Sequence, residues 1–484
     1  MFESIKLDRN DTKPMYIQLY ERISSLIDTG DITGGKLPSI RALAKALDVN
    51  NVTVISAYRE LEKEGYVYSQ KGSGTFVREK SSLETPASVE EGDIELMLSG
   101  IFPLLKESTD FASVSPTPDL FPIEEFKEAL IEVLDRDKGE AFLYPEVTGY
   151  GPLRESISKF LNDNYSIKTP KEQILITSGG QQGLDIISKT LVGQNDVILV
   201  ENPTYPGAYS AFKSRGAKIV GIPMTKDGID TDALRREVRK LSPKFIYLMP
   251  NFQSPTTICY SREKKLEVLK LAKEYGFYII EDDFLTDLNF SPEQRKPMKT
   301  FDDSDSVIFI KSFSKIFMPG VRIGFMTLPA PLFRDILKAK HSTDVSSSGY
   351  LQRAFDLYLR KGMWKDYIEK IISFYKEKYD YMISGLSDLK KAGISFHNPG
   401  GGLSIWVRLP EDIDAVELYE ECSRRKLAIV PGRVFYLDES EGDEYIRLSF
   451  SSVSIPQIDE GIKILTSILE EKNGIKIERY MPFL

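Results

Sequence analysis

Cysteine and histidine are scarce in this sequence, which has two of each among 484 residues. Cys259 and Cys422 are too few for a disulfide framework. His341 and His397 do not combine with these cysteines into the spacing of a Cys/His zinc cluster, so the sequence predicts no metal site. We therefore expect a protein of the reducing cytoplasm.

Long hydrophobic runs are also missing. No apolar stretch approaches the roughly 20 residues that a membrane-spanning helix needs, so the sequence predicts no membrane span. The first residues, MFESIKLDRN, lack the apolar core of a signal peptide. A membrane protein is therefore not expected.

The acidic net charge of −9 is spread unevenly along the chain. Residues 1–80 carry 12 Lys and Arg against 11 Asp and Glu, whereas the remainder carries 51 against 61. This charge balance alone does not indicate nucleic-acid binding. The length favours more than one domain, because single cores rarely grow beyond about 250–300 residues.

The first domain, residues 1–78, contains three helical patterns followed by a hairpin. Apolar residues between 16 and 27 share one helical face, and Pro38-Ser39 opens a second helix. Asn50 or Asn51 caps a third helix, whose inner face is formed by Val54, Ala57, Tyr58 and Leu61. The segment YVYSQKGSGTFV predicts two short strands around a turn. A helix-turn-helix followed by such a wing suits DNA binding.

This segment resembles the GntR-type winged helix through LPSIRALA, VTVISAYRELEKEGYV and GSGTFV. The resemblance implies that phosphates are contacted by Ser39, Arg41, Thr53 and the wing residues Gly72, Ser73 and Gly74. It implies that Asn50, Asn51 and Val52 face the bases. Asn51 stands where the family usually has arginine, which removes a charge from that surface. The alternative is a helical hairpin that contacts only protein.

The rest of the chain predicts a linker and a large α/β domain. Residues 79–107 form the linker, of which 79–96 is polar and acidic. In residues 108–484, helical patterns alternate with apolar strands, which predicts a mostly parallel sheet with helices on both faces. We expect a large part at about 108–375 and a smaller C-terminal subdomain at about 376–484.

Small or polar residues follow most of these strands, at the edge where ligands bind in open α/β sheets. The segment TSGGQQG at 177–183 begins a helix and suits a phosphate. NPTYPG places Tyr205 where its ring can lie against an aromatic ligand, and EDDF places Asp282 where it needs a cationic partner. KSFSK supplies the amine of Lys315, and Arg322 supplies a guanidinium. Pyridoxal phosphate, an aromatic phosphorylated aldehyde that forms an imine with lysine, is a ligand that matches every one of these groups.

Residues from about 108 to 470 resemble a fold-type I aminotransferase, and with the winged helix the chain resembles the MocR/GabR subfamily of GntR regulators. The resemblance implies that Lys315 is the catalytic lysine that binds pyridoxal phosphate covalently. It implies that Asp282 pairs with the pyridine nitrogen, Tyr205 stacks on the ring, and Arg447 binds a substrate carboxylate. The phosphate would be held by Gly179, Gly180, Gln181, Ser312 and Arg322.

Two cofactor positions depart from the family pattern. Ser254 stands where aminotransferases commonly have asparagine, and Phe284 stands where these regulators commonly have tyrosine. Both lost groups would hydrogen-bond the ring hydroxyl of the cofactor, so the change affects catalytic tuning more than binding.

Two functions remain open at this point. The first is a homodimeric transcriptional regulator that binds operator DNA and senses pyridoxal phosphate or an amino compound. The second is a working aminotransferase that transfers an amino group to a 2-oxo acid. A lyase or decarboxylase on the same scaffold has no distinguishing residue here.

Overall fold

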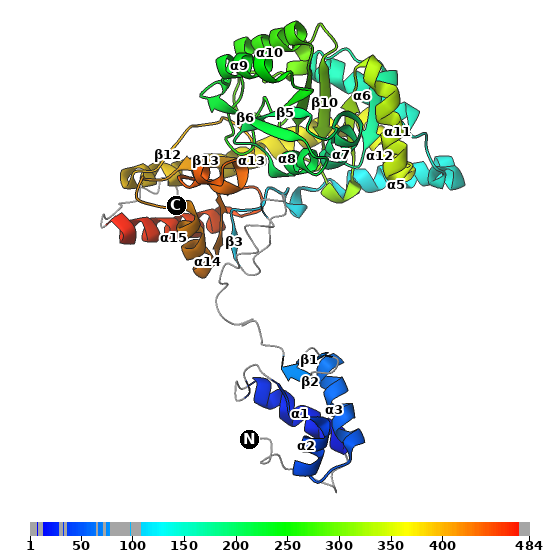
Figure 1. Ribbon diagram of the computed structural model, residues 1–484. Helices are drawn as coiled ribbons and strands as arrows, with labels where there is room; N and C mark the ends of the chain where they lie inside the picture. The colour runs from blue at the N-terminus through cyan, green and yellow to red at the C-terminus, as the bar shows by residue number, and fades with distance from the viewer. Residues whose placement is uncertain are drawn as a thin grey trace. The chain divides into compact units, whose positions relative to one another are not determined.

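The computed structural model describes residues 7, 13–28, 32, 36–63, 66–70, 74–77, 97 and 108–473. The chain forms two compact units, divided between Ala87 and Ser88 (Figure 1). Apart from Met97, the predicted linker at 79–107 lies outside the described residues.

The described residues of the first unit form three helices and a two-stranded antiparallel sheet, as predicted. The elements are α1 (Met15–Asp28), α2 (Ile40–Ala46), α3 (Asn51–Lys63), β1 (Val67–Gln70) and β2 (Gly74–Val77). The predicted inner face of α3 is buried against α1 and α2, where it meets Leu19, Ile23 and Leu43. Burial of this apolar face holds the helices together, since a unit of this size has little other core.

Capping residues begin both helices of the helix-turn-helix. The Ser39 hydroxyl accepts a hydrogen bond from the Ala42 amide of α2 at 3.3 Å. The Asn50 Oδ1 accepts one from the Val52 amide at the start of α3, at 3.1 Å. Asn51 and Val52, the first two residues of α3, are exposed, and Val52 is 63% exposed, so the helix presents these two side chains to solvent.

The second unit is built on an eight-stranded sheet in the order β4-β11-β10-β9-β8-β5-β6-β7. The pairings β10–β9, β9–β8, β8–β5 and β5–β6 are parallel, whereas β11 and β7 run antiparallel to their neighbours. The predicted mostly parallel sheet is therefore confirmed. Its strands are β4 (Ile174–Thr177), β5 (Val197–Asn202), β6 (Lys218–Thr225), β7 (Gly228–Ile229), β8 (Phe245–Leu248), β9 (Tyr278–Asp283), β10 (Val307–Ser312) and β11 (Gly324–Thr327).

Helices cover both faces of this sheet because alternate strand residues belong to different cores. Leu199 and Ile246 belong to the first core, whereas Val200 and Tyr247 belong to the second. The helices packed on the first core are α5 (Ile123–Asp137), α6 (Gly151–Tyr165), α9 (Thr231–Leu241), α10 (Arg262–Tyr275) and α12 (Gly349–Arg360). Those on the second core are α7 (Gly180–Leu191), α8 (Pro206–Lys213) and α11 (Phe333–Asp344).

A smaller antiparallel sheet lies in the C-terminal part (Figure 1). Its order is β12 (Ser395–Phe396), β13 (Ser404–Arg408), β16 (Tyr445–Ser449) and β15 (Val430–Pro431). The neighbouring helices are α13 (Met363–Leu389), α14 (Ala415–Arg424) and α15 (Ile455–Asn473). Beside them, β14 (Leu427–Ala428) pairs in parallel with β3 (Thr109–Asp110), so chain from the start of this unit joins its C-terminal part.

Within the part of the chain that the structure describes, no helix combines the length and apolarity needed to cross a membrane. The same residues contain no cluster of His, Cys, Asp and Glu that is arranged to hold a metal ion.

Candidate functional site

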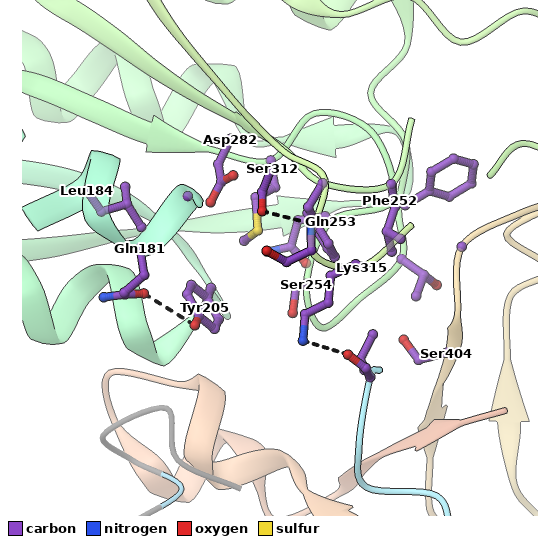
Figure 2. A pocket seen from close by; sticks show the side chains of 18 of the residues that line it. Gln181, Leu184, Tyr205, Phe252, Gln253, Ser254, Asp282, Ser312, Lys315 and Ser404 are labelled. Atoms are coloured by element: carbon purple, nitrogen blue, oxygen red, sulfur yellow. Dashed lines mark hydrogen bonds between the residues drawn. The ribbon is translucent and has the colours of Figure 1, made fainter. Parts of the chain in front are cut away.

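A cavity of about 290 Å³ opens where the large sheet meets the C-terminal part of the second unit (Figure 2). Its walls come from residues far apart in the sequence, on strand ends and helix starts. The cavity is lined by ten of the residues that the sequence predicts for the cofactor and substrate: Gly180, Gln181, Tyr205, Ser254, Asp282, Phe284, Ser312, Lys315, Arg322 and Arg447.

Lys315 lies in the turn that follows β10, whose six residues are all buried. Its ammonium group donates a hydrogen bond to the Val114 carbonyl oxygen at 2.6 Å. Burial, together with the positive charges of Arg447 and Arg322, lowers the pKa of Lys315 to about 8. Near pH 8 a larger fraction of this amine is therefore neutral than in an exposed lysine, and the neutral amine is the state that acts as a nucleophile.

Asp282 lies near the end of β9 and is only 8% exposed. Burial raises the pKa of Asp282 to about 6, although a hydrogen bond from the Tyr247 hydroxyl to Oδ2 at 2.8 Å opposes the shift. The buried Lys311 pairs instead with the neighbouring Asp283 at 3.0 Å and with Asp287 at 2.7 Å. Asp282 therefore faces the cavity as a carboxylate without a cation of its own among the described residues, which suits a cationic ligand.

Tyr247 was not identified from the sequence. It lies on β8 opposite Ile280, and residues two apart on a strand share a face, so Tyr247 and Asp282 point to the same side. The register of two distant strands creates this contact. The available sequence signal was a tyrosine within the apolar run FIYL.

The start of α7 forms a second polar corner. Gly179 precedes the helix with a φ of +97°, and a Cβ there would lie 2.9 Å from Nη2 of Arg322. The Arg322 guanidinium donates to the Ser178 carbonyl oxygen and to the Ser314 hydroxyl, the latter at 3.3 Å. Helix N–H groups beside a guanidinium favour an anion, and glycine lets the two approach closely.

Tyr205 and Gln181 line the same side of the cavity and contact each other (Figure 2). The Tyr205 hydroxyl donates to Oε1 of Gln181 at 3.4 Å, and Nε2 of Gln181 donates to the Gly207 carbonyl oxygen at 2.9 Å. These bonds tie the start of α7 to the start of α8. Ser312 is held nearby, since its hydroxyl accepts from the Ser314 amide at 3.3 Å.

Arg447 enters the cavity from β16 and is 5% exposed. Its guanidinium donates to the Ala112 carbonyl oxygen and lies 5.2 Å from the centre of the Phe435 ring. Burial lowers the pKa of Arg447 to about 10. It therefore adds a second guanidinium to the cavity beside Arg322, on the C-terminal side.

Ten further residues, none of them predicted from the sequence, complete the wall of the cavity. They are Val114, Leu184, Met249, Phe252, Gln253, Thr257, Leu285, Ser314, Gly402 and Ser404. Met249 to Thr257 belong to one segment after β8, Ser404 is the first residue of β13, and Gly402 precedes that strand by two residues. Only the tertiary structure brings these segments together.

The residues predicted to contact DNA lie mostly at the starts of α2 and α3. Arg41, Asn50 and Asn51 are exposed, and Thr53 is half-buried in the first turn of α3. Gly74 begins β2 with a φ of +126°. Gly72 and Ser73 lie outside the described residues.

Two family models match different parts of the chain. Residues 112–465 match the model for class I and II aminotransferases, and residues 15–77 match the model for bacterial regulatory proteins of the gntR family. The two models thus divide the chain into an N-terminal module and the large second unit, which is called the body below.

Relatives of both kinds are similar to this chain. The aromatic-amino-acid aminotransferase 1 of Thermococcus litoralis is 33% identical, covering 82% of this chain and 98% of the relative. The uncharacterized HTH-type transcriptional regulator YdfD of Bacillus subtilis is 30% identical, covering 95% and 97%. The probable rhizopine catabolism regulatory protein MocR of Rhizobium meliloti is 25% identical and covers 98% of both chains. The two regulators match nearly the whole chain.

Among solved structures, the multiple substrate aminotransferase of Thermococcus profundus is 32% identical, with a TM-score of 0.73 over 80% of this chain and 96% of that one. LysN, the alpha-aminoadipate aminotransferase of Thermus thermophilus complexed with N-(5'-phosphopyridoxyl)-L-leucine, is 30% identical, with a TM-score of 0.69 over 76% and 93%. The body therefore has the fold of an aminotransferase.

Proposed function

Because this chain belongs to the MocR/GabR subfamily of GntR regulators, with a body of the class I and II aminotransferase family, we propose that it is a transcriptional regulator dependent on pyridoxal phosphate. It binds operator DNA through the winged helix. It senses pyridoxal phosphate or an amino compound through the cavity of its body.

One observation carries the proposal. A single cavity holds an amine, a buried carboxylate and a guanidinium at a helix start, namely Lys315, Asp282 and Arg322, in a chain that also has a gntR domain. These groups fit pyridoxal phosphate, which has an aldehyde, a basic ring nitrogen and a phosphate. When bound, this cofactor supplies an aldehyde that condenses with amines and a ring that withdraws electrons.

The chain's own residues take distinct roles in this proposal. Lys315 provides the neutral amine for covalent attachment, and Asp282 holds a proton on the ring nitrogen. Arg322, Ser312 and the backbone at Gly179–Gln181 bind the phosphate. Tyr205 would lie against the ring, and the wall at Ser254 and Phe284 would face its hydroxyl. Arg447 binds the carboxylate of an amino compound.

We further propose a homodimer that acts in the cytoplasm, where its DNA lies. The body has an exposed apolar segment that supports this proposal: Phe142, Leu143 and Tyr144 are 68%, 66% and 86% exposed. Contiguous exposed apolar residues are typical of association surfaces, and a two-fold protein suits a two-part operator. Light scattering of the cofactor-loaded protein at micromolar concentration should give the mass of a dimer. A monomer would contradict this part.

The second candidate is an active aminotransferase. It is favoured by Arg447 and Lys315 lining the same cavity. Arg447 would bind the carboxylate of an amino acid, whose amine would displace the Lys315 amine from the cofactor. The test adds individual amino acids to the loaded protein and follows the absorbance of the bound cofactor. Complete conversion to the pyridoxamine form, followed by recovery with a 2-oxo acid, would establish turnover.

The proposed function itself is tested by two measurements on one preparation. Borohydride reduction followed by peptide mapping should place the cofactor on Lys315, and footprinting should locate a protected site in the DNA flanking the protein's own gene. Labelling of another lysine, or no protection beyond that of unrelated DNA, would contradict it.

A further inference from the structure

A carboxylate with no assigned role lies behind the cavity wall. Glu201 is the fifth residue of β5 and its side chain has no exposed surface. Burial raises the pKa of Glu201 to about 7, and no cation among the described residues contributes to the shift. Because a buried carboxylate without a cation is costly, its hydrogen bonds must provide the compensation.

Three donors converge on this carboxylate. The Met249 amide lies 3.2 Å from each of its two oxygens, and the Tyr260 hydroxyl donates to Oε1 at 2.6 Å. Nε2 of Gln253 donates to Oε2 at 3.1 Å. All three partners belong to the segment after β8, so one acceptor on β5 fixes that segment at several points.

Gln253 extends this connection to a second segment. Its Nε2 also donates to the Pro203 carbonyl oxygen at 2.8 Å, and its Oε1 accepts from the amide and hydroxyl of Thr256 at 2.9 and 2.6 Å. Gln253 itself lines the cavity next to Ser254 (Figure 2), and Pro203 lies two residues before Tyr205. One side-chain amide therefore connects two separate walls of the cavity, and Glu201 accepts one of its two N–H groups.

We propose that Glu201 is a positioning residue for the cofactor. Through Gln253 it holds the Ser254 wall and the Tyr205 wall at the separation that admits the ring. This inference rests on the proposed function, because it takes pyridoxal phosphate as the ligand. Without an acceptor at position 201, the Gln253 NH2 group keeps only the Pro203 oxygen as a partner, and one of its two N–H groups is left buried without an acceptor.

The variants Glu201→Met and Glu201→Gln test this role, with Tyr260→Phe as the matched control. Methionine keeps the length of the side chain but has no comparable acceptor, and glutamine keeps the shape without the charge. Tyr260→Phe removes a donor from the same carboxylate and leaves the Gln253 bond in place. Tyr260 does not line the cavity, so it controls for a general loss of stability.

Each full-length variant is titrated with pyridoxal phosphate, recording affinity and the absorbance spectrum of the bound cofactor, alongside denaturant unfolding of the cofactor-free protein. Glu201→Met is expected to weaken affinity by about tenfold or more and to shift the spectrum, since a hydrogen bond to a charged group is lost. Glu201→Gln should weaken the affinity several-fold. Tyr260→Phe should bind the cofactor within about twofold of the parent's affinity and show the parent's spectrum.

Two results would overturn the inference. One is a Glu201→Met protein with the parent's affinity and spectrum. The other is a Tyr260→Phe loss as large as that of Glu201→Met, which would make the carboxylate merely structural. If Glu201→Met does not fold, Glu201→Gln decides by the same criteria. A parent protein that binds no pyridoxal phosphate would overturn the proposed function, and this inference with it.

Discussion

The Asp282 carboxylate is poorly stabilised in the cofactor-free protein. Burial raises its pKa from 3.8 to about 6, so between these values the folded state binds more protons than the unfolded chain. Its contribution to stability therefore falls as pH rises through this window and stays unfavourable above about pH 6. A shift of this size corresponds to about 3 kcal/mol, which the fold gives up at neutral pH to keep an ionised group in the cavity.

Asp282→Asn should therefore stabilise the cofactor-free protein at pH 7 while weakening cofactor binding. Removing the charge removes the desolvation penalty, but it also removes the partner of the ring nitrogen. Thermal unfolding should give a melting temperature higher by a few degrees, with affinity for pyridoxal phosphate lower by about tenfold or more. Asp412→Asn, the same change at an exposed position, is the control and should alter neither. A destabilised Asp282→Asn protein would show that the carboxylate is structural.

Lys315 gives a second pH prediction, for a rate that rises with pH. Burial and two nearby guanidinium groups lower its pKa to about 8, and only the neutral amine attacks an aldehyde. The rate of covalent cofactor attachment should therefore rise with pH and level off above about pH 8 to 9. Stopped-flow absorbance across this range measures it. A rate still climbing toward pH 10.5 would mean that the amine is an ordinary exposed lysine.

At the scale of single residues, sequence patterns located groups at strand ends but not the residues that hold them. Lys315 and Asp282 follow apolar runs and Arg322 follows the turn at Pro319-Gly320, and all three were expected to face one crevice of the sheet. Tyr247 and Glu201 act across strands, through a register that a single sequence does not encode locally. Their polarity inside apolar runs was the only signal.

At the scale of elements, the winged helix and the large sheet were predictable because each rests on local periodicity. The runs VILVEN and VIFIKS are continuous and apolar at their centres, which is typical of strands buried on both faces. The pairing of β3 with β14 joins residues 109–110 to residues 427–428 and has no local pattern. The small sheet was therefore expected only as a C-terminal subdomain.

The helix-turn-helix gives a prediction at this scale. Arg41 is exposed in the first turn of α2, beside the capping Ser39. Loss of a phosphate contact weakens binding to all sequences and lowers the salt dependence of the binding constant by about one unit of slope per contact. Arg41→Ala should therefore weaken operator affinity and flatten its salt dependence, leaving the cofactor spectrum unchanged.

Fluorescence anisotropy with operator DNA at several salt concentrations measures this effect. Arg334→Ala removes the same charge from an exposed position on α11 of the body and is the matched control. Equal effects from the two variants would mean that Arg41 acts only through net charge.

At the scale of the whole molecule, the two units must be coupled for the protein to regulate. A ligand changes DNA binding only if it has different affinities for the competent and incompetent states of the protein. Lys315 and Arg447 lie in the body, and neither belongs to the unit that carries the helix-turn-helix. Replacing either by alanine should leave basal DNA affinity within a few fold of the parent and remove the response to an amino compound.

The most direct test measures operator affinity of the full-length parent and of Lys315→Ala, each with and without pyridoxal phosphate and each common amino acid in turn. We predict that at least one amino acid changes the affinity of the cofactor-loaded parent, and that Lys315→Ala keeps the basal affinity but does not respond. A Lys315→Ala protein that responds as the parent does, or a parent with one affinity under all conditions, would contradict sensing through this cavity.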